Sequence, residues 1–324
     1  MTHMTISIII PAYNAERYVD RCLKSVYSDS LSEEKFEVVA INDGSKDNTV
    51  ELLHAWRDKH KNITLLDKEN EGVSVARNAG IEVAKGKYVL FLDVDDELMG
   101  GALTKVCNYL EEHEPMDMLV TRQIRNDGKQ EKIVDKPPLE EHWSYDGFEA
   151  FRKGFIRTNA GGGICRREFL KEHEISFPAG VKNAEDTIFF GHVQVYAKSI
   201  VYFNVPLYRI NEEKASASRS NDHTKLAKSH ITTMWAVADV KKSLKEDREH
   251  RAIFDFVVYQ LLSNTIADFV KSNDLGYSDF KREVDTSVLL PIDTVNMTMM
   301  RNKARLMNIS VTLFYFMSWL KNRR

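Results

Sequence analysis

The first hundred residues alternate between short apolar runs and segments whose apolar residues recur at helical spacing. The apolar runs are residues 6–10, 36–41, 63–66 and 88–92. We expect each run to be a buried strand, because a short, almost wholly apolar run fits a strand covered on both faces. Between them, apolar residues three or four positions apart predict helices, for example at 18–26 and 73–84. Strands that alternate with helices predict a parallel sheet built from βαβ units.

Polar residues follow three of the four expected strands. Tyr13 and Asn14 follow the first, Asp43 follows the second, and Asp93 and Asp95 follow the fourth. In open α/β sheets, ligands bind outside the carboxyl ends of the strands. We therefore expect these side chains to converge on one ligand site. Asn14 is also a suitable N-cap for the helix that follows.

Four carboxylates fall within five residues directly after the fourth run, at Asp93, Asp95, Asp96 and Glu97. A divalent cation that carries a phosphorylated ligand would offset their repulsion, because Mg²⁺ is commonly held by one or two carboxylates plus phosphate oxygens. The alternative is an acidic turn that caps a helix beginning near Glu97. The chain has neither G-x-G-x-x-G nor G-x-x-x-x-G-K-[ST], which excludes both glycine-rich phosphate cradles. Without such a cradle, a pyrophosphate needs a metal.

Four segments resemble, in order, the motifs of the family 2 glycosyltransferases. They are residues 8–14 (IIIPAYN), 42–45 (NDGS), 76–80 (ARNAG) and 93–96 (DVDD). The resemblance is specific over residues 4–100 and continues more weakly to about residue 218. It implies a GT-A fold, which is an α/β fold with a Rossmann-like mixed sheet flanked by helices. It also implies a nucleotide-sugar donor, usually a UDP-sugar, a divalent metal (Mn²⁺ or Mg²⁺), and inversion at the anomeric carbon.

The resemblance assigns nucleotide-sugar roles to residues after the first three strands. Pro11 and Tyr13 would form the floor of the base pocket, with Asn14 in the same site. Asp43 would accept the N3–H of uracil, and the change of the preceding acid to asparagine should do little harm. Arg77 would face the nucleotide or its phosphates. The alternatives are a turn or helix-capping acid for Asp43 and a surface arginine on an amphipathic helix for Arg77.

The resemblance also assigns the metal and the catalytic base. Asp93 and Asp95 form the D-x-D motif, in which Asp95 would bind the metal and Asp93 would contact ribose or a metal-bound water. In the segment NAEDTIFF, Asp186 would be the base and Glu185 would help to position the acceptor or the donor sugar. The alternative is that both acids simply begin a helix, where the macrodipole favours them. Arg209 would reach the pyrophosphate.

The chain is expected to have two domains. The catalytic domain would span residues 1–218, with a nucleotide-binding half at 1–100 and an acceptor half at 101–218. Residues 219–324 contain few glycines or prolines, which predicts an all-helical C-terminal domain. Three consecutive glycines at 161–163 predict a close backbone approach beside the sugar site.

An uncharged segment near the C-terminus, residues 306–320, carries four aromatic residues and has basic residues on both sides. It is too short to span a bilayer. One interpretation is a helix that lies in an anionic membrane interface. The other is a helix packed on the C-terminal domain or on a second subunit, which leaves a homo-oligomer open.

Composition and charge favour some classes of protein and exclude others. The 324 residues are 43% hydrophobic and 29% charged, which is typical of a globular protein with a sizeable core. A net charge of −3 gives no global basic field, so no nucleic-acid partner is expected. Three widely spaced cysteines are expected to be reduced thiols, and His192 and His223 ordinary polar residues. No signal peptide or transmembrane run is recognised, so we expect a cytoplasmic location, with peripheral contact at the inner face of the cell membrane left open.

These patterns predict a metal-dependent inverting glycosyltransferase of the hexosyl or N-acetylhexosaminyl class, active in polysaccharide biosynthesis. The acceptor would be a hydroxyl of a glycan or lipid-linked saccharide, an expectation that comes from the family alone. One alternative is a sugar nucleotidyltransferase, but the loop at residues 11–14 lacks the glycines needed to grip a triphosphate. The other is a non-catalytic nucleotide-sugar-binding protein of the same fold.

Overall fold

The four apolar runs of the first hundred residues form adjacent parallel strands. In the computed structural model they are β1 (Ile6–Ala12), β2 (Phe36–Asp43), β3 (Ile63–Lys68) and β4 (Tyr88–Phe91), in the order β3-β2-β1-β4. All residues of β1, β2 and β4 are buried, as expected for strands covered on both faces. The predicted parallel βαβ sheet is confirmed.

Later strands extend this sheet with antiparallel pairs and one parallel pair, β6 with β10. They are β5 (Glu97–Leu98), β6 (Met118–Asn126), β7 (Glu131–Ile133), β8 (His142–Tyr145), β9 (Gly163–Arg166) and β10 (Ile200–Asn211). The order continues from β4 as β9-β6-β10-β5, while β7 pairs with β6 and β8 with β10. Because β9 runs antiparallel to both β4 and β6, the sheet is mixed. The predicted fold class, a mixed sheet flanked by helices, is confirmed.

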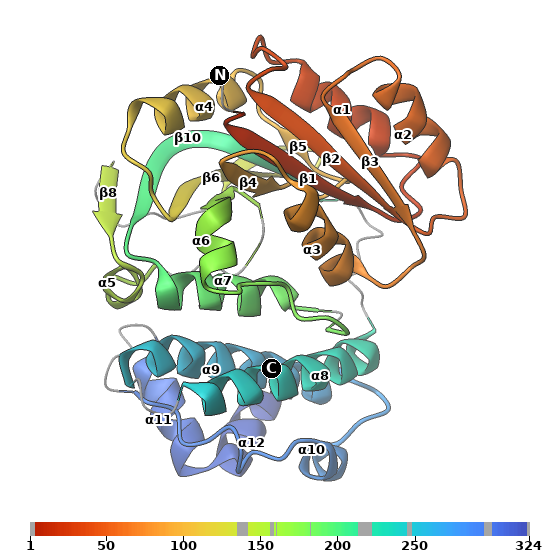
Figure 1. Cartoon of the computed structure of the whole chain (residues 1–324). Coiled ribbons are helices and arrows are strands. Elements are labelled where there is room, and N and C mark those ends of the chain that lie inside the picture. The colour runs from red at the N-terminus through yellow and green to blue at the C-terminus, as the bar shows by residue number, and fades with distance from the viewer. Residues whose placement is uncertain are drawn as a thin grey trace. The chain divides into compact units, whose positions relative to one another are not determined.

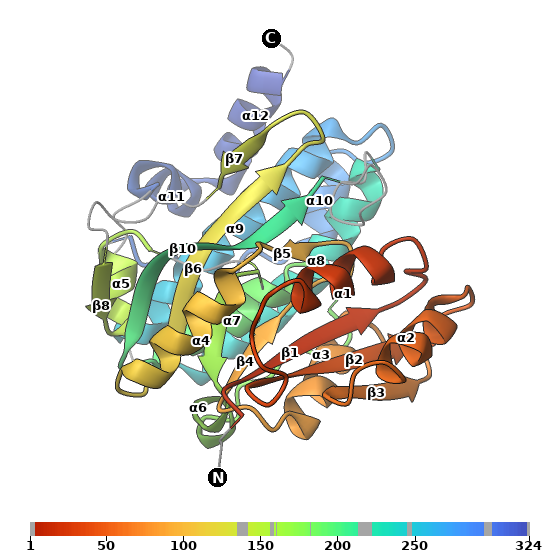
Figure 2. The ribbon, with the colours of Figure 1, turned by 90° about the horizontal axis from the view of Figure 1, so that it is seen from above.

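Helices cover both faces of the sheet. Up to residue 172 the helices are α1 (Val19–Tyr27), α2 (Thr49–Arg57), α3 (Val73–Val83), α4 (Ala102–Glu112), α5 (Gly147–Arg152) and α6 (Arg167–Glu172), of which α5 belongs almost wholly to the helical unit defined below. Figures 1 and 2 show α1, α2 and α4 on one face and α3 and α6 on the other. Gly80 allows α3 to approach closely, since an added Cβ would lie 2.5 Å from Ile9 Cγ2.

Two local predictions are wrong. Tyr18, not Asn14, precedes α1 as its N-cap, and it makes no side-chain capping bond. Glu97 lies in strand β5, and the next helix begins only at Ala102. The acidic cluster therefore does not cap a helix that begins near Glu97, and that interpretation of it fails.

The C-terminal region is all-helical in its described part, as predicted, with α8 (His223–Ser243), α9 (Arg248–Lys271), α10 (Tyr277–Glu283), α11 (Arg301–Ile309) and α12 (Val311–Asn322). One further helix, α7 (Glu185–Tyr196), comes before the predicted helical region. Residues 251–271 are long and apolar enough to cross a membrane by length and composition only. However, 72% of their apolar window is buried, as is usual for the core helix of a helical domain. The segment 306–320 is not one helix, because Ser310 is extended and separates α11 from α12.

The chain divides into two compact units. The sheet unit comprises Met1–Gly147, Asn159–Gly180 and Tyr196–Lys214, and the helical unit comprises Phe148–Thr158, Val181–Val195 and Ala215–Arg324. The structure describes residues 4–134, 142–155, 159, 161–181, 183–212, 222–244, 248–294 and 300–322. The predicted domain boundary at residues 218 and 219 lies outside the described residues, and the predicted domain limits stay a prediction. All three cysteines are buried with free thiols.

Candidate active site

Two loops at the carboxyl edge of the sheet, after β1 and after β2, are joined by hydrogen bonds. The bonds are Asn14 N to Ser45 Oγ (3.0 Å), Lys46 N to Asn14 Oδ1 (2.8 Å), Ala15 N to Thr49 Oγ1 (2.7 Å) and Glu16 N to Asp47 Oδ2 (3.1 Å). Asn14 takes a left-handed backbone conformation, with φ 48°. Its side chain thus connects the two loops. Pro11 is buried at the end of β1, whereas Tyr13 is 50% exposed and presents its ring to solvent.

Asp43 is the last residue of β2 and is buried. Its Oδ1 accepts hydrogen bonds from Glu71 N and Lys68 Nζ, both at 3.0 Å, and its Oδ2 accepts one from Gly72 N at 2.9 Å. The carboxylate therefore holds the turn that leads into α3, as the helix-capping interpretation proposes. A carboxylate has about four acceptor positions, and these three bonds leave room for one more donor on Oδ2.

Arg77 lies on α3 and is only 3% exposed, so the interpretation of it as a surface arginine is wrong. Its Nη2 donates to Asp93 Oδ1 at 2.8 Å. The guanidinium also lies 5.1 Å from the ring centroid of Phe177, a cation–π contact. The motif at 76–80 and the D-x-D motif are thus joined by a direct ion pair.

Asp95 is held through its backbone. Its carbonyl oxygen accepts from Arg21 Nη2 at 2.5 Å and from Asn211 Nδ2 at 3.2 Å. Asn211 Nδ2 also donates to Glu97 Oε2 at 2.9 Å. These contacts fix the turn after β4 against α1 and against the end of β10.

Asp96 and Tyr208 form a buried pair beneath the D-x-D turn. The Tyr208 hydroxyl accepts from Asp93 N at 3.1 Å, and Asp96 Oδ1 accepts from Asn211 N at 2.8 Å. Burial, followed by the charges of Asp93 and Asp95, raises the pKa of Asp96 to about 8. Burial, followed by the charges of Asp93 and Asp96, likewise raises the pKa of Tyr208. Neither residue was predicted as part of the site, although the place of Asp96 in the acidic cluster was a signal.

Arg209 follows on β10 and is engaged with two acids. Its Nη2 lies 2.8 Å from Glu131 Oε1, and its Nη1 lies 4.0 Å from Glu97 Oε1. A guanidinium has five N–H donors, so these pairs do not prevent a contact with a pyrophosphate. Its predicted role stays a prediction.

The predicted close backbone approach occurs at Gly161, while its place beside a sugar site stays a prediction. A Cβ on Gly161 would clash with Gln123 Nε2 and would lie 2.9 Å from Tyr208 Cε1. Gly162 has φ 71°, a conformation that suits glycine. The backbone therefore packs directly on the tyrosine that supports Asp93 and Asp96.

The chemistry of this edge fits a hard divalent cation that is shared with a substrate. Within the described part of the chain, no group of three His, Cys, Asp or Glu side chains is arranged to hold a metal alone. Mg²⁺ sites that include substrate phosphates need only one or two carboxylates. Asp93 and Asp95 supply two partly exposed carboxylates, and their negative charge helps to raise the pKa of Asp96.

Glu185 and Asp186 begin α7 and belong to the helical unit, whereas the residues described above belong to the sheet unit. The segment before them is anchored on α8. Asn183 Nδ2 lies 3.2 Å from His230 Nε2, and Asn183 O accepts from Thr233 Oγ1 at 2.5 Å. Ala184 then turns the chain with φ 61°, a left-handed conformation that is uncommon for alanine. The two acids occupy the first turn of the helix, as the helix-start interpretation also proposes.

A buried aspartate supports that anchor. Asp268 on α9 lies 3.1 Å from His230 Nδ1 and 2.9 Å from His223 Nδ1. Burial favours a raised pKa for Asp268, but hydrogen bonds from His230 and His223 outweigh it and lower this pKa below its ordinary value. With its proton on Nδ1, His230 can accept from Asn183 through Nε2. Neither histidine is thereby an isolated surface group.

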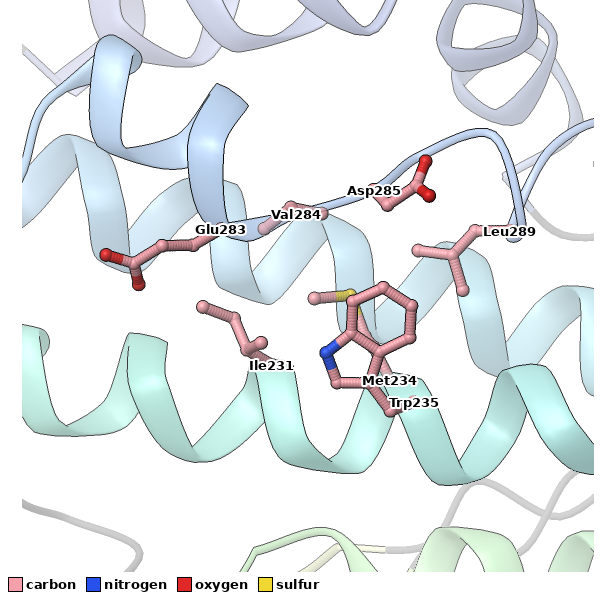
Figure 3. Close-up of a pocket in the computed structure, with 7 residues that line it drawn as sticks. All are labelled: Ile231, Met234, Trp235, Glu283, Val284, Asp285 and Leu289. Atoms are coloured by element: carbon pink, nitrogen blue, oxygen red, sulfur yellow. The ribbon is translucent and has the colours of Figure 1, made fainter.

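A small apolar hollow in the helical unit is unrelated to the predicted site. Figure 3 shows Met234 and Trp235 of α8 facing the segment from Glu283 to Leu289. None of the predicted site residues lines it. The candidate active site is therefore the carboxyl edge of the sheet.

Comparisons with known proteins find related sequences. The sequence model of the family described as glycosyl transferase family 2 matches residues 7–173, just over half of the chain. A poly(ribitol-phosphate) beta-glucosyltransferase of Bacillus spizizenii is 29% identical over 199 residues, which cover 61% of this chain and 30% of that protein. The uncharacterized glycosyltransferase YibD of Escherichia coli is 31% identical over 231 residues, covering 66% of this chain and 63% of YibD. This chain thus spans less than two thirds of the length of either relative.

Solved structures share the fold. The crystal structure of S. aureus TarS 1-349 in complex with UDP-GlcNAc superposes with a TM-score of 0.67 at 20% identity, covering 99% of this chain and 92% of that one. A mannosyltransferase, PcManGT from Pyrobaculum calidifontis, in complex with GDP-Man and Mn²⁺, gives a TM-score of 0.54 at 17% identity, covering 95% and 87%. These likenesses extend over the helical region as well as the sheet.

Proposed function

The chain belongs to glycosyltransferase family 2, and on that premise we propose that it transfers a sugar from a nucleotide diphosphate to an acceptor hydroxyl. The observation that carries the proposal is the convergence of Asp43, the Arg77–Asp93 pair and Asp95 at one edge of the sheet. These groups come from three separate motifs of the family. They lie where an α/β sheet binds its ligands.

A UDP-sugar is the donor we propose. Asp43 has an acceptor position left to receive the N3–H of uracil, a hydrogen that neutral cytosine lacks. The exposed ring of Tyr13 is available to stack on the base. TarS has been solved with UDP-GlcNAc and with UDP. Relatives named as glucosyl- and N-acetylglucosaminyltransferases make a hexose or N-acetylhexosamine the sugar to test first.

Asp95, together with Asp93, is proposed to hold Mn²⁺ or Mg²⁺. When bound, the cation would offset the negative charge on the departing diphosphate. This chain's own part is to fix the carboxylates. Arg77 holds the side chain of Asp93, while Arg21 and Asn211 hold the backbone of Asp95. The structure of PcManGT in complex with GDP-Man and Mn²⁺ supports testing a metal.

Asp186 is proposed as the base. The acceptor oxygen forms a bond to the anomeric carbon as the bond from that carbon to the diphosphate breaks, and the hydroxyl proton passes to Asp186. Such a base contributes about 10²–10⁴ in rate. Glu185 is proposed to position the acceptor or the donor sugar.

The acceptor is proposed to be a hydroxyl of a glycan or lipid-linked saccharide in surface-polysaccharide synthesis. Relatives with names such as poly(ribitol-phosphate) beta-glucosyltransferase and teichoic acid poly(glycerol phosphate) polymerase support this class. The proposed location is the cytoplasm.

The test is release of UDP from UDP-glucose and UDP-N-acetylglucosamine, with Mn²⁺, by the wild type and by Asp186→Asn. We expect turnover by the wild type and a loss of about 10²–10⁴ in the variant, with binding of UDP retained. Asp222→Asn, at the start of α8, is the control for a carboxylate at a helix start. Turnover by Asp186→Asn at the wild-type rate would place the base elsewhere. Binding without turnover by the wild type would favour a non-catalytic nucleotide-sugar-binding protein.

A further inference from the structure

The last two helices expose an apolar face. The exposed fractions are 80% for Ile309, 48% for Leu313, 45% for Phe316, 51% for Met317 and 58% for Leu320. Four of these residues, from Leu313 to Leu320, fall three or four positions apart and so share one side of α12. We call these four residues, together with Ile309 at the end of α11, the α12 face. A cluster of exposed large apolar side chains within so short a stretch indicates an interaction site, whereas single exposed ones need no explanation.

The opposite side of α12 holds the helix on the helical unit. Tyr315 is buried, and its ring centroid lies 5.0 Å from that of Tyr277 and 5.4 Å from that of Phe280, both on α10. The hydroxyl of Tyr277 also bonds Thr312 Oγ1 at 2.5 Å. Packing on the C-terminal helices therefore accounts for Tyr315. Phe316, at the edge of the α12 face, also contacts Tyr277, with ring centroids 5.1 Å apart. Packing does not account for the other three α12 residues of the face, which lie on the side of the helix away from Tyr315.

The charge around this face is positive. From residue 300 to the last described residue, 322, the chain has Arg301, Lys303, Arg305 and Lys321 and no aspartate or glutamate, in a chain whose net charge is −3. Lys303, Arg305 and Lys321 are exposed. On the neighbouring α10, Asp279 is already paired with Arg282 at 2.8 Å. An apolar helix side with basic residues before and after it is the pattern of a helix that lies on an anionic lipid surface.

We propose that the α12 face inserts into the interface of an anionic phospholipid bilayer. The helix has 12 residues and is about 18 Å long, against a hydrocarbon core of about 30 Å, so it would lie in the interface without spanning it. A second copy of the chain fits this face less well. In a two-fold dimer the same patch meets itself, which would bring the basic residues of the two copies together. A lipid surface with negative headgroups complements both the apolar and the basic residues.

The test is co-sedimentation of the full chain with phosphatidylcholine vesicles, with and without phosphatidylglycerol. We expect binding that requires phosphatidylglycerol and weakens with salt, since surface charges are screened. The triple variant Ile309→Ser, Leu313→Ser, Leu320→Ser should bind at least about tenfold more weakly, because it removes much of the apolar area available for burial. These side chains are exposed, so the fold should persist. The control is Ile133→Ser, at an exposed isoleucine of β7.

A second pair of variants tests the charges. Lys303→Gln with Arg305→Gln should weaken binding to the anionic vesicles by about fivefold per residue, since each cation near such a surface contributes about 1 kcal/mol. The control, Lys61→Gln with Lys85→Gln, removes two exposed lysines of the sheet unit and should leave binding unchanged. Equal sedimentation of the triple serine variant and the wild type would overturn the proposal. The proposal would also be overturned if the wild type bound neither kind of vesicle and instead formed a dimer, detected by light scattering, that was absent in the triple variant.

Discussion

Arg77 and Asp93 form an ion pair of 2.8 Å in which the arginine is almost fully buried and the aspartate is partly exposed. Arg77 lies on α3, within the motif at residues 76–80. The pair therefore orients the carboxylate of Asp93, which is the first acid of the D-x-D motif. The buried guanidinium also contacts Phe177. Arg77 therefore acts on Asp93 whether or not it also reaches a bound nucleotide.

Replacement of Arg77 by methionine should weaken donor binding as well as the fold. The variant keeps the apolar stem but leaves Asp93 without its partner, so we expect a rise of about tenfold or more in the donor KM and a loss of about 2 kcal/mol in unfolding free energy. The control is Arg166→Met on β9, which breaks a similar ion pair, 2.9 Å between Arg166 Nη2 and Asp117 Oδ1. Arg166→Met should lose stability and keep the donor KM. A wild-type KM in Arg77→Met would contradict this role.

Asp43→Asn should reduce the preference for uracil. The amide keeps the size of the side chain but replaces one acceptor oxygen by a donor, so the bonds from Glu71 N, Gly72 N and Lys68 cannot all persist together with one to N3–H. We expect the affinity ratio of UDP to CDP, measured by calorimetry, to fall by about tenfold. Asp67→Asn, at the end of β3, is the matched control. An unchanged ratio in Asp43→Asn would remove Asp43 from base recognition.

Asp268→Asn should affect the rate more than donor binding. Asp268 fixes His230, which in turn lies against Asn183 just before Glu185 and Asp186. Loosening this anchor should lower kcat by about tenfold, while the donor KM stays near the wild-type value, because positioning a reacting group is worth large factors in rate. His230→Gln should behave in the same way. A loss of folding stability with kcat unchanged would show that the cluster only supports the helices.

Stability should fall in mild acid because of His192. Burial lowers the pKa of His192 from 6.5 to about 4, so the folded chain keeps it neutral where the unfolded chain takes up a proton. No effect is expected above pH 6.5. Between pH 6.5 and 4 the unfolding free energy should drop by about 1.4 kcal/mol per pH unit from this group, or about 3 kcal/mol in all.

Urea unfolding of wild type and His192→Phe over that range measures this contribution. The aromatic replacement can keep the ring contact with Phe254, whose centroid lies 5.1 Å away. The pH dependence of the variant should be shallower below pH 6.5. A variant at the exposed His113 should show the same pH dependence of the unfolding free energy as the wild type. Parallel pH curves for His192→Phe and wild type would contradict the account.

The sequence predicted the parallel half of the sheet well because its strands are short, buried and separated by amphipathic helices. The positions of Asp43, Asp93 and Asp95 followed from the strand ends. The supports of these residues were not predictable in the same way. Asn211 and Tyr208 reach the D-x-D turn only because β10 crosses the sheet to pair with β5. Such pairing between distant segments produces no local pattern of apolar residues from which it could be predicted.

Two local features of the backbone were also not predicted from the sequence. Ser310 ends α11 and interrupts the last apolar segment. Helix propensity alone did not predict this break. Asn14 looks like a helix cap, but its side chain accepts from Lys46 N in the neighbouring loop instead. At Asn14 a contact with another loop determines the conformation, whereas at Ser310 the bond is local, because its hydroxyl accepts from Leu313 N in the first turn of α12.

Thermal unfolding with UDP and Mn²⁺, on wild type and Asp95→Asn, tests the central claim most directly. Asp95 is fixed through its backbone carbonyl, so the amide variant should keep the fold, and Asp58→Asn, at an exposed aspartate after α2, is the control. A ligand at about 100 times its Kd stabilises by about 2.7 kcal/mol, a readable shift. The account predicts a UDP shift that requires Mn²⁺ in wild type and control and disappears in Asp95→Asn. A shift that is independent of Mn²⁺ or intact in Asp95→Asn would contradict it.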